Sequence, residues 1–166
     1  MVVIPEKSPV PAKSAQQSYQ RNGYEFFQRV IKTLQLFNGI IDSTMARGEG
    51  WEYIQIGQHL ERADKTSRLL DDAFHLFRDE EADRDASLLQ WSSILKACSA
   101  RKMYQRTYDA DIVPMRAVGL LLLHPGLPRS IRYCVETVDS SLRRLSGVSS
   151  GQFSSLSEKL SGRLLS

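Results

Sequence analysis

The residues of this chain best suited to chemistry are Glu61 and Arg62, which stand side by side in the segment GWEYIQIGQHLERADKTSRLL. Neighbouring helical residues point about 100° apart, so these two side chains cannot simply pair with each other. Within a helix Glu61 can reach Lys65, four residues further on, and Arg62 lies one turn from Gln58. An arginine removed from water needs a carboxylate, carbonyl groups or a bound anion. The pair therefore predicts either a clamp between helices or a site for an anion or substrate.

A second set of anion-binding candidates lies in the segment LPRSIR. Arg129, Ser130 and Arg132 would stand at the N-terminus of a helix, where free N–H groups and the helix dipole favour phosphate or carboxylate. Ser130 could instead only cap the first turn, and Arg129 could only pair with an acid such as Glu61. Our sharper expectation is that Arg62 and Arg129 line one polar pocket with Glu61 orienting them. Their guanidiniums should then lie near each other or share an acidic partner.

Other catalytic or metal-binding arrangements find little support in the sequence. Asp72 and His75 have the acid-to-histidine spacing of di-iron bundles, but such sites need a second pair and two further carboxylates, and no second pair is visible. None of the three histidines lies in a nucleophile motif. Cys98 and Cys134 lie on apolar helical patterns and are predicted to be buried thiols, and an intracellular context disfavours a disulfide between them. We expect no metal and no cofactor.

The elements that position the candidates are amphipathic helices, and the one around Glu61 has two packing faces. One face, predicted to be its core face, carries Tyr53, Ile56, Leu60, Ala63, Ser67, Leu70, Phe74 and Phe77. The opposite face is apolar at both ends and charged in its middle, where Glu61 and Arg62 stand. A flank between the faces carries Glu52, His59 and Thr66, which we expect to be solvated. Glu61 and Arg62 are thus predicted to lie at the centre of a second packing surface.

Helical patterns joined by short connections fill the rest of the chain. The predicted helices cover residues 23–47, 51–78, 86–108, a segment capped by Asp111 and ending before Pro125, a segment from 128 or 129 to 145, and a terminal segment, 153–164. Gly48 and Gly50 are expected to stop the first of them. No alternating strand pattern competes with these helices. The sequence therefore predicts an all-α fold, an antiparallel bundle of five to six helices.

Composition bounds the domain organisation and the partners. With 166 residues, 42% of them hydrophobic, the chain can bury a core in one domain over residues 22–166, whereas residues 1–21 are predicted to be disordered. The longest strongly apolar run, 117–123, is far shorter than the roughly 20 residues that span a bilayer, and no secretory signal is seen. A formal charge of +3 without a basic stripe argues against nucleic acid. We expect a cytoplasmic protein that binds neither membranes nor nucleic acid.

Several segments of the chain resemble the alpha-E family, predicted all-helical bacterial proteins named for a Glu-Arg motif. The similarity centres on WEYIQIGQHLERADKTSRLLD and continues through GIIDSTMARGEGW, QWSSILKACSARKMYQRTY and HPGLPRSIRYCVETV, so it covers about Gly23 to Leu145. One departure is Gln58, where family members typically carry an arginine ahead of the motif. A second is length, because those members look longer, with an earlier helical half that bears its own Glu-Arg motif. The chain resembles only their second half.

The resemblance implies an accessory role more than a reaction. Alpha-E proteins look like partners of ATP-grasp ligases and transglutaminase-like proteins in systems that make or modify peptides, and their own activity is not established. We therefore expect a helical accessory or interaction module that could present a carboxylate or peptide to such a partner. The alternative is an enzyme of unknown reaction class with an anion-binding site around Glu61, Arg62 and Arg129. A chain that resembles one half is expected to form a homodimer or to bind a separate helical half.

Overall fold

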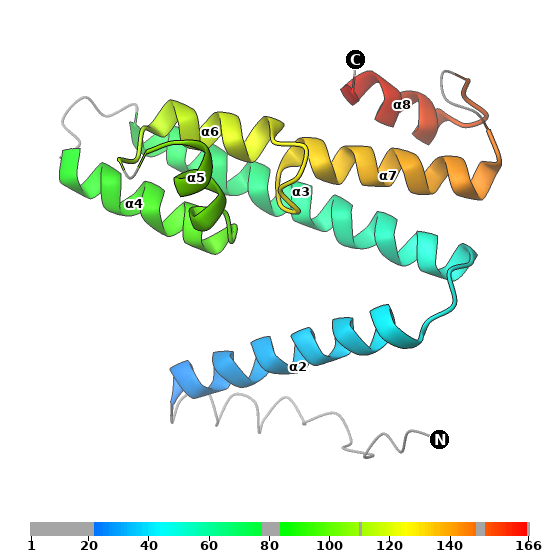
Figure 1. Ribbon diagram of the computed structural model, residues 1–166, viewed down its shortest axis with the longest axis horizontal. Helices are drawn as coiled ribbons and strands as arrows, with labels where there is room; N and C mark the ends of the chain where they lie inside the picture. Colours follow the sequence, from blue (N-terminus) through cyan, green and yellow to red (C-terminus); the bar gives the residue numbers. More distant parts are fainter. Residues whose placement is uncertain (1–21, 78–83, 110, 149–151, 166) are drawn as a thin grey trace. The chain divides into compact units, whose positions relative to one another are not determined.

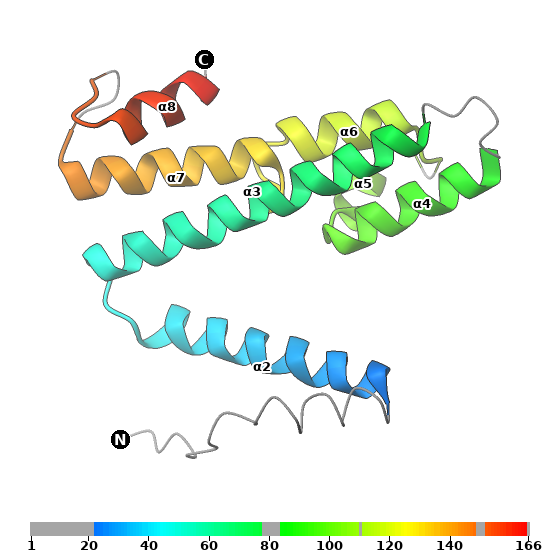
Figure 2. The same ribbon diagram turned by 180° about the vertical axis from the view of Figure 1, so that it is seen from behind.

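The computed structural model describes residues 22–77, 84–109, 111–148 and 152–165, and in this part of the chain it contains seven α-helices and no strand (Figures 1 and 2). The all-α prediction is therefore confirmed, whereas the predicted disorder of residues 1–21 concerns residues outside the described ranges. The helices are α2 (Gly23–Thr44), α3 (Glu49–Phe77), α4 (Arg84–Ala97), α5 (Arg101–Thr107), α6 (Pro114–Leu123), α7 (Ile131–Ser146) and α8 (Leu156–Leu165). The chain divides into two compact units, Met1–Ala46 and Arg47–Ser166.

Helix α2 belongs to the first unit and starts at a sequence signal. The side chain of Asn22 accepts a hydrogen bond from the backbone N–H of Glu25 at 3.3 Å, which satisfies one of the free donors at the helix start. The apolar residues Phe27, Leu34 and Phe37 expose 53–57% of their surfaces. None of the residues of α2 is buried. The helix is formed as predicted, although it ends at Thr44 rather than at Arg47.

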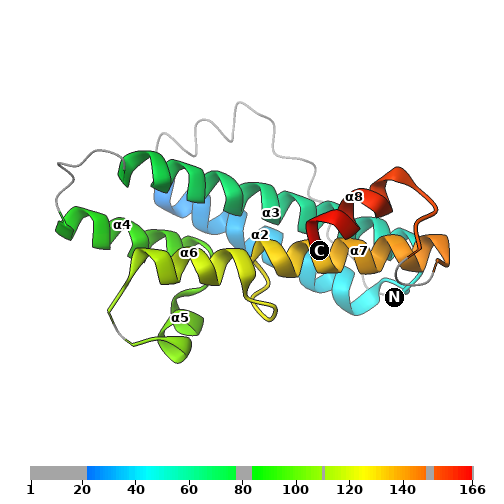
Figure 3. The same cartoon turned by 90° about the horizontal axis from the view of Figure 1, so that it is seen from above.

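Helix α3 is the central helix of the second unit. Helices α6 and α7 follow one another along α3 and run antiparallel to it, α4 also runs antiparallel to it, and α8 packs on α7 (Figures 1 and 3). Helix α5 packs on α4. Short connections favour antiparallel neighbours, as α3 and α4 are, whereas α6 and α7 run on in the same direction along α3.

The hydrophobic core lies where the second half of α3 meets α4, α5 and α6. Trp91, Leu95, Tyr104, Leu120 and Leu121 expose 2% of their surfaces or less. Leu127, in the connection ahead of α7, also belongs to this core. The smaller residues that complete it are Ala73, Cys98, Ala100 and Ala117. This core lies along the second half of α3. The contact between the first half of α3 and α7 therefore depends on interactions outside the core.

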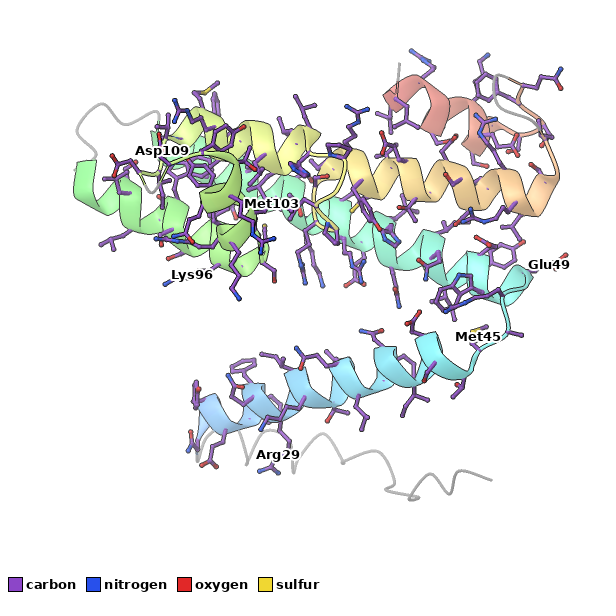
Figure 4. All side chains as sticks on the ribbon, in the orientation of Figure 1. Arg29, Met45, Glu49, Lys96, Met103 and Asp109 are labelled. Atoms are coloured by element: carbon purple, nitrogen blue, oxygen red, sulfur yellow. The ribbon has the colours of Figure 1, made fainter. Side chains whose placement is uncertain are left out.

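The helix predicted over residues 86–108 is two helices, α4 and α5. Ser99, between them, adopts a left-handed backbone conformation with a φ of 53°, and the N–H groups of Ser99 and Ala100 bond back to carbonyls in the last turn of α4. Figure 4 labels Lys96 and Met103, which lie on either side of this break. The prediction was wrong here because the turn contains neither glycine nor proline, so no local signal marks it.

Helix ends differ from their predicted positions elsewhere as well. Gly50, predicted to stop the first helix, lies inside the first turn of α3. Helix α7 begins at Ile131, after Ser130, rather than at residue 128 or 129. These differences leave the order and the type of the elements unchanged.

Tyr104 fixes the chain between α5 and α6. Its hydroxyl accepts a hydrogen bond from the N–H of Val113 at 2.8 Å and donates one to the carbonyl oxygen of Asp111 at 3.2 Å. Val113 therefore takes the cap position of α6, without a side-chain cap, and Asp111 contributes its backbone oxygen. The prediction that Asp111 caps this helix is wrong. The backbone groups of the loop bond instead to the buried hydroxyl of Tyr104 on α5.

Replacing Tyr104 with phenylalanine should lower the free energy of unfolding by about 1–3 kcal/mol, because the backbone groups that bond to the hydroxyl lose their partner in a buried site. Chemical denaturation monitored by circular dichroism measures the loss. Tyr108→Phe is the matched control, since Tyr108 lies beside Tyr104 with ring centroids 5.1 Å apart and is only half-buried. Equal losses in the two variants would contradict the role assigned to the Tyr104 hydroxyl.

Candidate functional site

The seam between α3 and α7 is built from residues that were expected to be solvated. Glu52, His59 and Thr66 expose 9%, 4% and 1% of their surfaces, and Ala73 continues the line at 0%. These residues recur every seven positions, the spacing that keeps one line of a helix against its neighbour. The solvated flank was therefore a wrong prediction, and the seven-residue repeat is the signal that could have revealed it.

A charged clamp closes the first end of the seam. The guanidinium of Arg144 donates a hydrogen bond to Oε1 of Glu52 at 2.7 Å and a second to the hydroxyl of Ser141 at 3.1 Å. The bond from Arg144 holds the pKa of Glu52 below its ordinary value, against the opposite effect of burial. Ser141 is fully buried. This pair joins α3 to α7 in the way predicted for a structural clamp, but with other residues than Glu61 and Arg62.

His59 and Arg62 form the middle of the seam. Nδ1 of His59 lies 2.8 Å from the carbonyl oxygen of Gln55, and Nε2 lies 3.3 Å from a guanidinium nitrogen of Arg62. Burial lowers the pKa of His59, which favours the neutral ring. A carbonyl oxygen can only accept, so Nδ1 donates to Gln55 and Nε2 accepts from Arg62. Arg62 is half-buried, and its hydrogen-bond partner is a neutral ring.

Glu61 is exposed to solvent and pairs with Lys65. Nζ of Lys65 lies 2.5 Å from Oε1 of Glu61, and the two side chains expose 61% and 64% of their surfaces. The hydrogen bond from Lys65 lowers the pKa of Glu61. The reach from Glu61 to Lys65 is as the spacing predicts, but Glu61 does not lie in a second packing surface. The strongly exposed pair adds little to stability.

The turn between α6 and α7 is tied to α3 next to Arg62. The hydroxyl of Thr66 donates a hydrogen bond to the carbonyl oxygen of Arg129 at 3.0 Å. Ser130, which is fully buried, accepts from the N–H of Tyr133 at 3.1 Å and donates to the carbonyl oxygen of His124 at 2.5 Å. Ser130 is therefore the N-cap of α7, one of the two roles considered from the sequence. The turn holds Arg129 in a fixed place against α3.

Arg132 takes no part in this region. Its guanidinium pairs with Glu136 one turn further along α7 at 2.7 Å, and both side chains are exposed, by 52% and 37%. Of the candidate residues, the structure brings Arg62, Arg129 and Ser130 to one region, where α3 meets the start of α7. Glu61 with Lys65, and Arg132 with Glu136, form separate surface pairs.

The two cysteines lie beside this region and are buried. Cys98 and Cys134 expose 1% and 0% of their surfaces, and both are free thiols. Burial raises the pKa of each thiol, while the positive charge of Arg129 opposes that rise at both, and the charge of Arg62 opposes it at Cys134. The sequence-based expectation of buried thiols holds, and neither thiol is poised to react.

The predicted core face of α3 is largely open. Tyr53, Leu60 and Phe74 expose 65%, 54% and 65% of their surfaces. Two apolar grooves follow this face. The first groove encloses about 250 Å³ between α3, α7 and α8, and its lining includes Ile56, Leu60, Val138, Leu142, Leu160 and Leu164. The second groove encloses about 440 Å³ between α3, α4 and α6, and its lining includes Leu70, Phe74, Trp91, Met115, Val118 and Leu122. We call them together the groove surface.

Helix α8 packs its polar side on α7 and leaves its leucines open. Glu158 and Ser161 expose 1% and 6% of their surfaces, whereas Leu156 and Leu164 expose 72% and 75%. The hydroxyl of Ser161 donates a hydrogen bond to Oδ1 of Asp139 at 2.7 Å. Sequence reasoning missed these polar anchors, because the pattern of the segment shows only an amphipathic helix. The leucines of α8 extend the groove surface instead of entering a core.

Two further observations bear on the class of protein. In the described ranges, no group of three or more histidine, cysteine, aspartate or glutamate side chains is placed to hold a metal ion. No helix among the described residues combines the length and apolar character needed to cross a bilayer.

Comparison with known proteins shows that the chain is similar to one protein family. A family described as a predicted alpha-helical domain with a conserved ER motif matches residues 8–166. In this chain a glutamate is followed by an arginine at Glu61 and Arg62 alone. No curated protein and no solved structure matches the chain.

Proposed function

The chain belongs to the Alpha-E family, and we propose that it is a helical accessory module that binds another protein through the groove surface. The observation that carries this proposal is the set of exposed apolar side chains that line two grooves along α3. Contiguous exposed apolar patches of more than a few hundred Å² mark interaction sites in soluble proteins. Leu60, Leu160 and Phe74 expose 54%, 49% and 65% of their surfaces; the two leucines line the first groove and the phenylalanine lines the second.

The shape of the groove surface suits an amphipathic helix. The two grooves are one helical turn apart on both walls, from Ala63 to Ser67 on α3 and from Val135 to Ile131 on α7. At 1.5 Å per residue, the face from Tyr53 to Phe74 is about 32 Å long, the length of a helix of roughly six turns. Helix-in-groove recognition places apolar anchors at intervals of three and four residues along such a surface.

The partner that we favour is an ATP-grasp ligase or a transglutaminase-like protein in a cytoplasmic system that makes or modifies peptides. The support for this choice is the resemblance of the chain to alpha-E proteins, whose partners look like enzymes of these two kinds. In this role the chain supplies docking, and the partner supplies the chemistry.

Placing a charge in the groove surface tests the proposal. Leu60→Glu on α3 and Leu160→Glu on α8 should each weaken binding to a purified ATP-grasp ligase or transglutaminase-like partner at least tenfold, because a carboxylate would lose its water on docking. The matched control is Leu89→Glu, since Leu89 is 71% exposed on α4 and lines neither groove. Isothermal titration calorimetry gives the three affinities.

The same variants separate this partner from other occupants. If Leu60→Glu leaves the affinity for the partner unchanged, the groove surface is not its docking site. A dimer that Leu60→Glu dissociates, seen by light scattering, would assign the surface to a second copy of the chain. A stable complex with a separately encoded helical half would assign it to that half.

An enzyme of unknown reaction class, with an anion-binding site around Glu61, Arg62 and Arg129, is the second candidate. The observation in its favour is that the backbone of Arg129 bonds to Thr66, one turn from Arg62 on α3, next to the N-terminus of α7. Glu61 fits this function less well, because Lys65 holds its carboxylate in solvent. Turnover by the purified chain that Arg62→Gln abolishes would support the enzyme, whereas turnover that occurs only when the partner is added supports the accessory module.

A further inference from the structure

We propose that Arg62 and Arg129 together bind an oxyanion, a carboxylate or a phosphate group, at the junction of α3 with the start of α7. This site is separate from the groove surface. At about 100° per residue, Arg62 lies on one side of the line from His59 to Thr66 along α3, and the groove residue Leu60 lies on the other. The inference therefore goes beyond partner docking and does not depend on it.

The backbone places the two arginines within reach of one ligand. Thr66 follows Arg62 by one helical turn, a spacing at which side chains on a helix are neighbours about 5–6 Å apart. The hydroxyl of Thr66 bonds the carbonyl oxygen of Arg129 at 3.0 Å, so the backbone of Arg129 lies against the turn of α3 that carries Arg62. The buried Ser130 fixes this turn by bonding both His124 and Tyr133.

No carboxylate among the described residues is bonded to either guanidinium. The two acids closest in sequence are already engaged, Glu61 with Lys65 and Glu136 with Arg132. The partner of Arg62 is the neutral ring of His59. Both arginines are half-buried. Two partly desolvated positive charges at one junction repel each other, and an anion between them would relieve that repulsion.

The chemistry of the site selects an oxyanion. A guanidinium presents a planar fork of N–H donors that matches the two oxygens of a carboxylate or phosphate. The N-terminus of α7, a helix of 16 residues, adds a favourable dipole at the same junction. At the buried Cys134 thiol, the positive charges of Arg62 and Arg129 both oppose the rise in pKa that burial causes, so both charges act at this junction. A peptide carboxylate or a phosphate monoester carries the required group.

The experiment is a titration of the intact chain, followed by NMR at constant ionic strength, with inorganic phosphate and with acetate as separate probes. The His59 ring is the reporter, because it bonds Arg62 and because the charge of Arg62 helps to lower its pKa. At least one probe should shift the His59 resonances along a saturating curve and raise the pKa of His59. Chloride at the same ionic strength should not. Saturation by phosphate alone assigns a phosphate ligand, and saturation by acetate assigns a carboxylate.

Variants decide whether the two arginines form the site. Arg62→Gln and Arg129→Gln should each weaken the binding of the probe at least tenfold, and Arg129→Lys should weaken it less because it keeps the charge. The control is Arg132→Gln, which removes an exposed arginine that is paired with Glu136. For Arg62→Gln, Tyr133 resonances replace those of His59 as the reporter, since the two rings lie 5.8 Å apart. Shifts that rise linearly with both probes, or that survive in both glutamine variants, overturn the proposal.

Discussion

Shortening Leu121 to alanine is expected to lower the free energy of unfolding by about 2–5 kcal/mol, the largest loss that we predict for a single side chain. Leu121 exposes 0% of its surface and packs in the core with Trp91 and Leu95. Removing three carbon atoms there takes apolar area out of the core and leaves a cavity that the surrounding helices can close only in part. Equilibrium unfolding in urea gives the difference.

Leu123→Ala is the matched control for this loss. Leu123 belongs to the same four-leucine run of α6 but exposes 63% of its surface. Its shortening should change the free energy of unfolding by less than about 0.5 kcal/mol. If the two variants lose similar stability, the run is buried on all sides, as an all-apolar helix segment would suggest. A difference locates the core on the Leu121 side of α6.

The existence and order of the helices could be predicted from the sequence, because amphipathic spacing and turn residues are local properties. The cap at Ser130 and the break at Pro125 are of this kind. The break at Ser99 is not, because a left-handed residue without glycine depends on the tertiary contacts around it. The single predicted helix over residues 86–108 fails at that point alone.

The buried seam of α3 is a second place where the apolar pattern of the sequence predicts the wrong face. The rule that apolar positions face the core assigns Tyr53 and Leu60 to the inside and His59 to the outside. The structure reverses both, because His59 finds a carbonyl and a guanidinium inside, and so its burial costs little. Both partners lie one turn away on α3 itself, but the packing against α7, where the Tyr133 ring lies 5.8 Å from that of His59, is not contained in the local pattern. The sequence grouped Arg62, Arg129 and Arg132 as candidates for an anion site. In the structure Arg62 and Arg129 share a junction, whereas Arg132 pairs with Glu136 on the surface.

Replacing Asp139 with alanine should lower the free energy of unfolding by about 2–3 kcal/mol and release α8 from α7. Asp139 exposes 9% of its surface. Its Oδ1 accepts from Ser161 at 2.7 Å, and its Oδ2 accepts from Nε of Arg143 at 2.7 Å. Without the carboxylate, the buried hydroxyl of Ser161 and the guanidinium of Arg143 lose this acceptor at the same time, although they keep the carbonyl oxygens of Glu158 and Gln152. The control is Glu136→Ala in the exposed pair with Arg132 on the same helix, which should cost about 0–1 kcal/mol.

Acid should reproduce the effect of this substitution. Burial raises the pKa of Asp139, but hydrogen bonds from Arg143 and Ser161 outweigh it, and the net pKa is lowered. The pKa of Glu158 on α8 is lowered too, by the bond from Ser146 above all. A carboxyl with a lowered folded-state pKa stabilises the fold above its unfolded pKa and loses that contribution as pH falls through the folded pKa.

The docking of α8 should therefore hold at neutral pH and weaken below about pH 4, under the ordinary range of carboxyl pKa values. Amide hydrogen exchange in α8 across this range measures the change, and Asp139→Ala should show fast exchange already at neutral pH with a flatter dependence on pH. Identical profiles in the two proteins would mean that other contacts hold α8. Because Leu160 and Leu164 line the first groove, release of α8 also removes one wall of the groove surface. Partner binding should then be lost over the same pH range in which exchange in α8 accelerates.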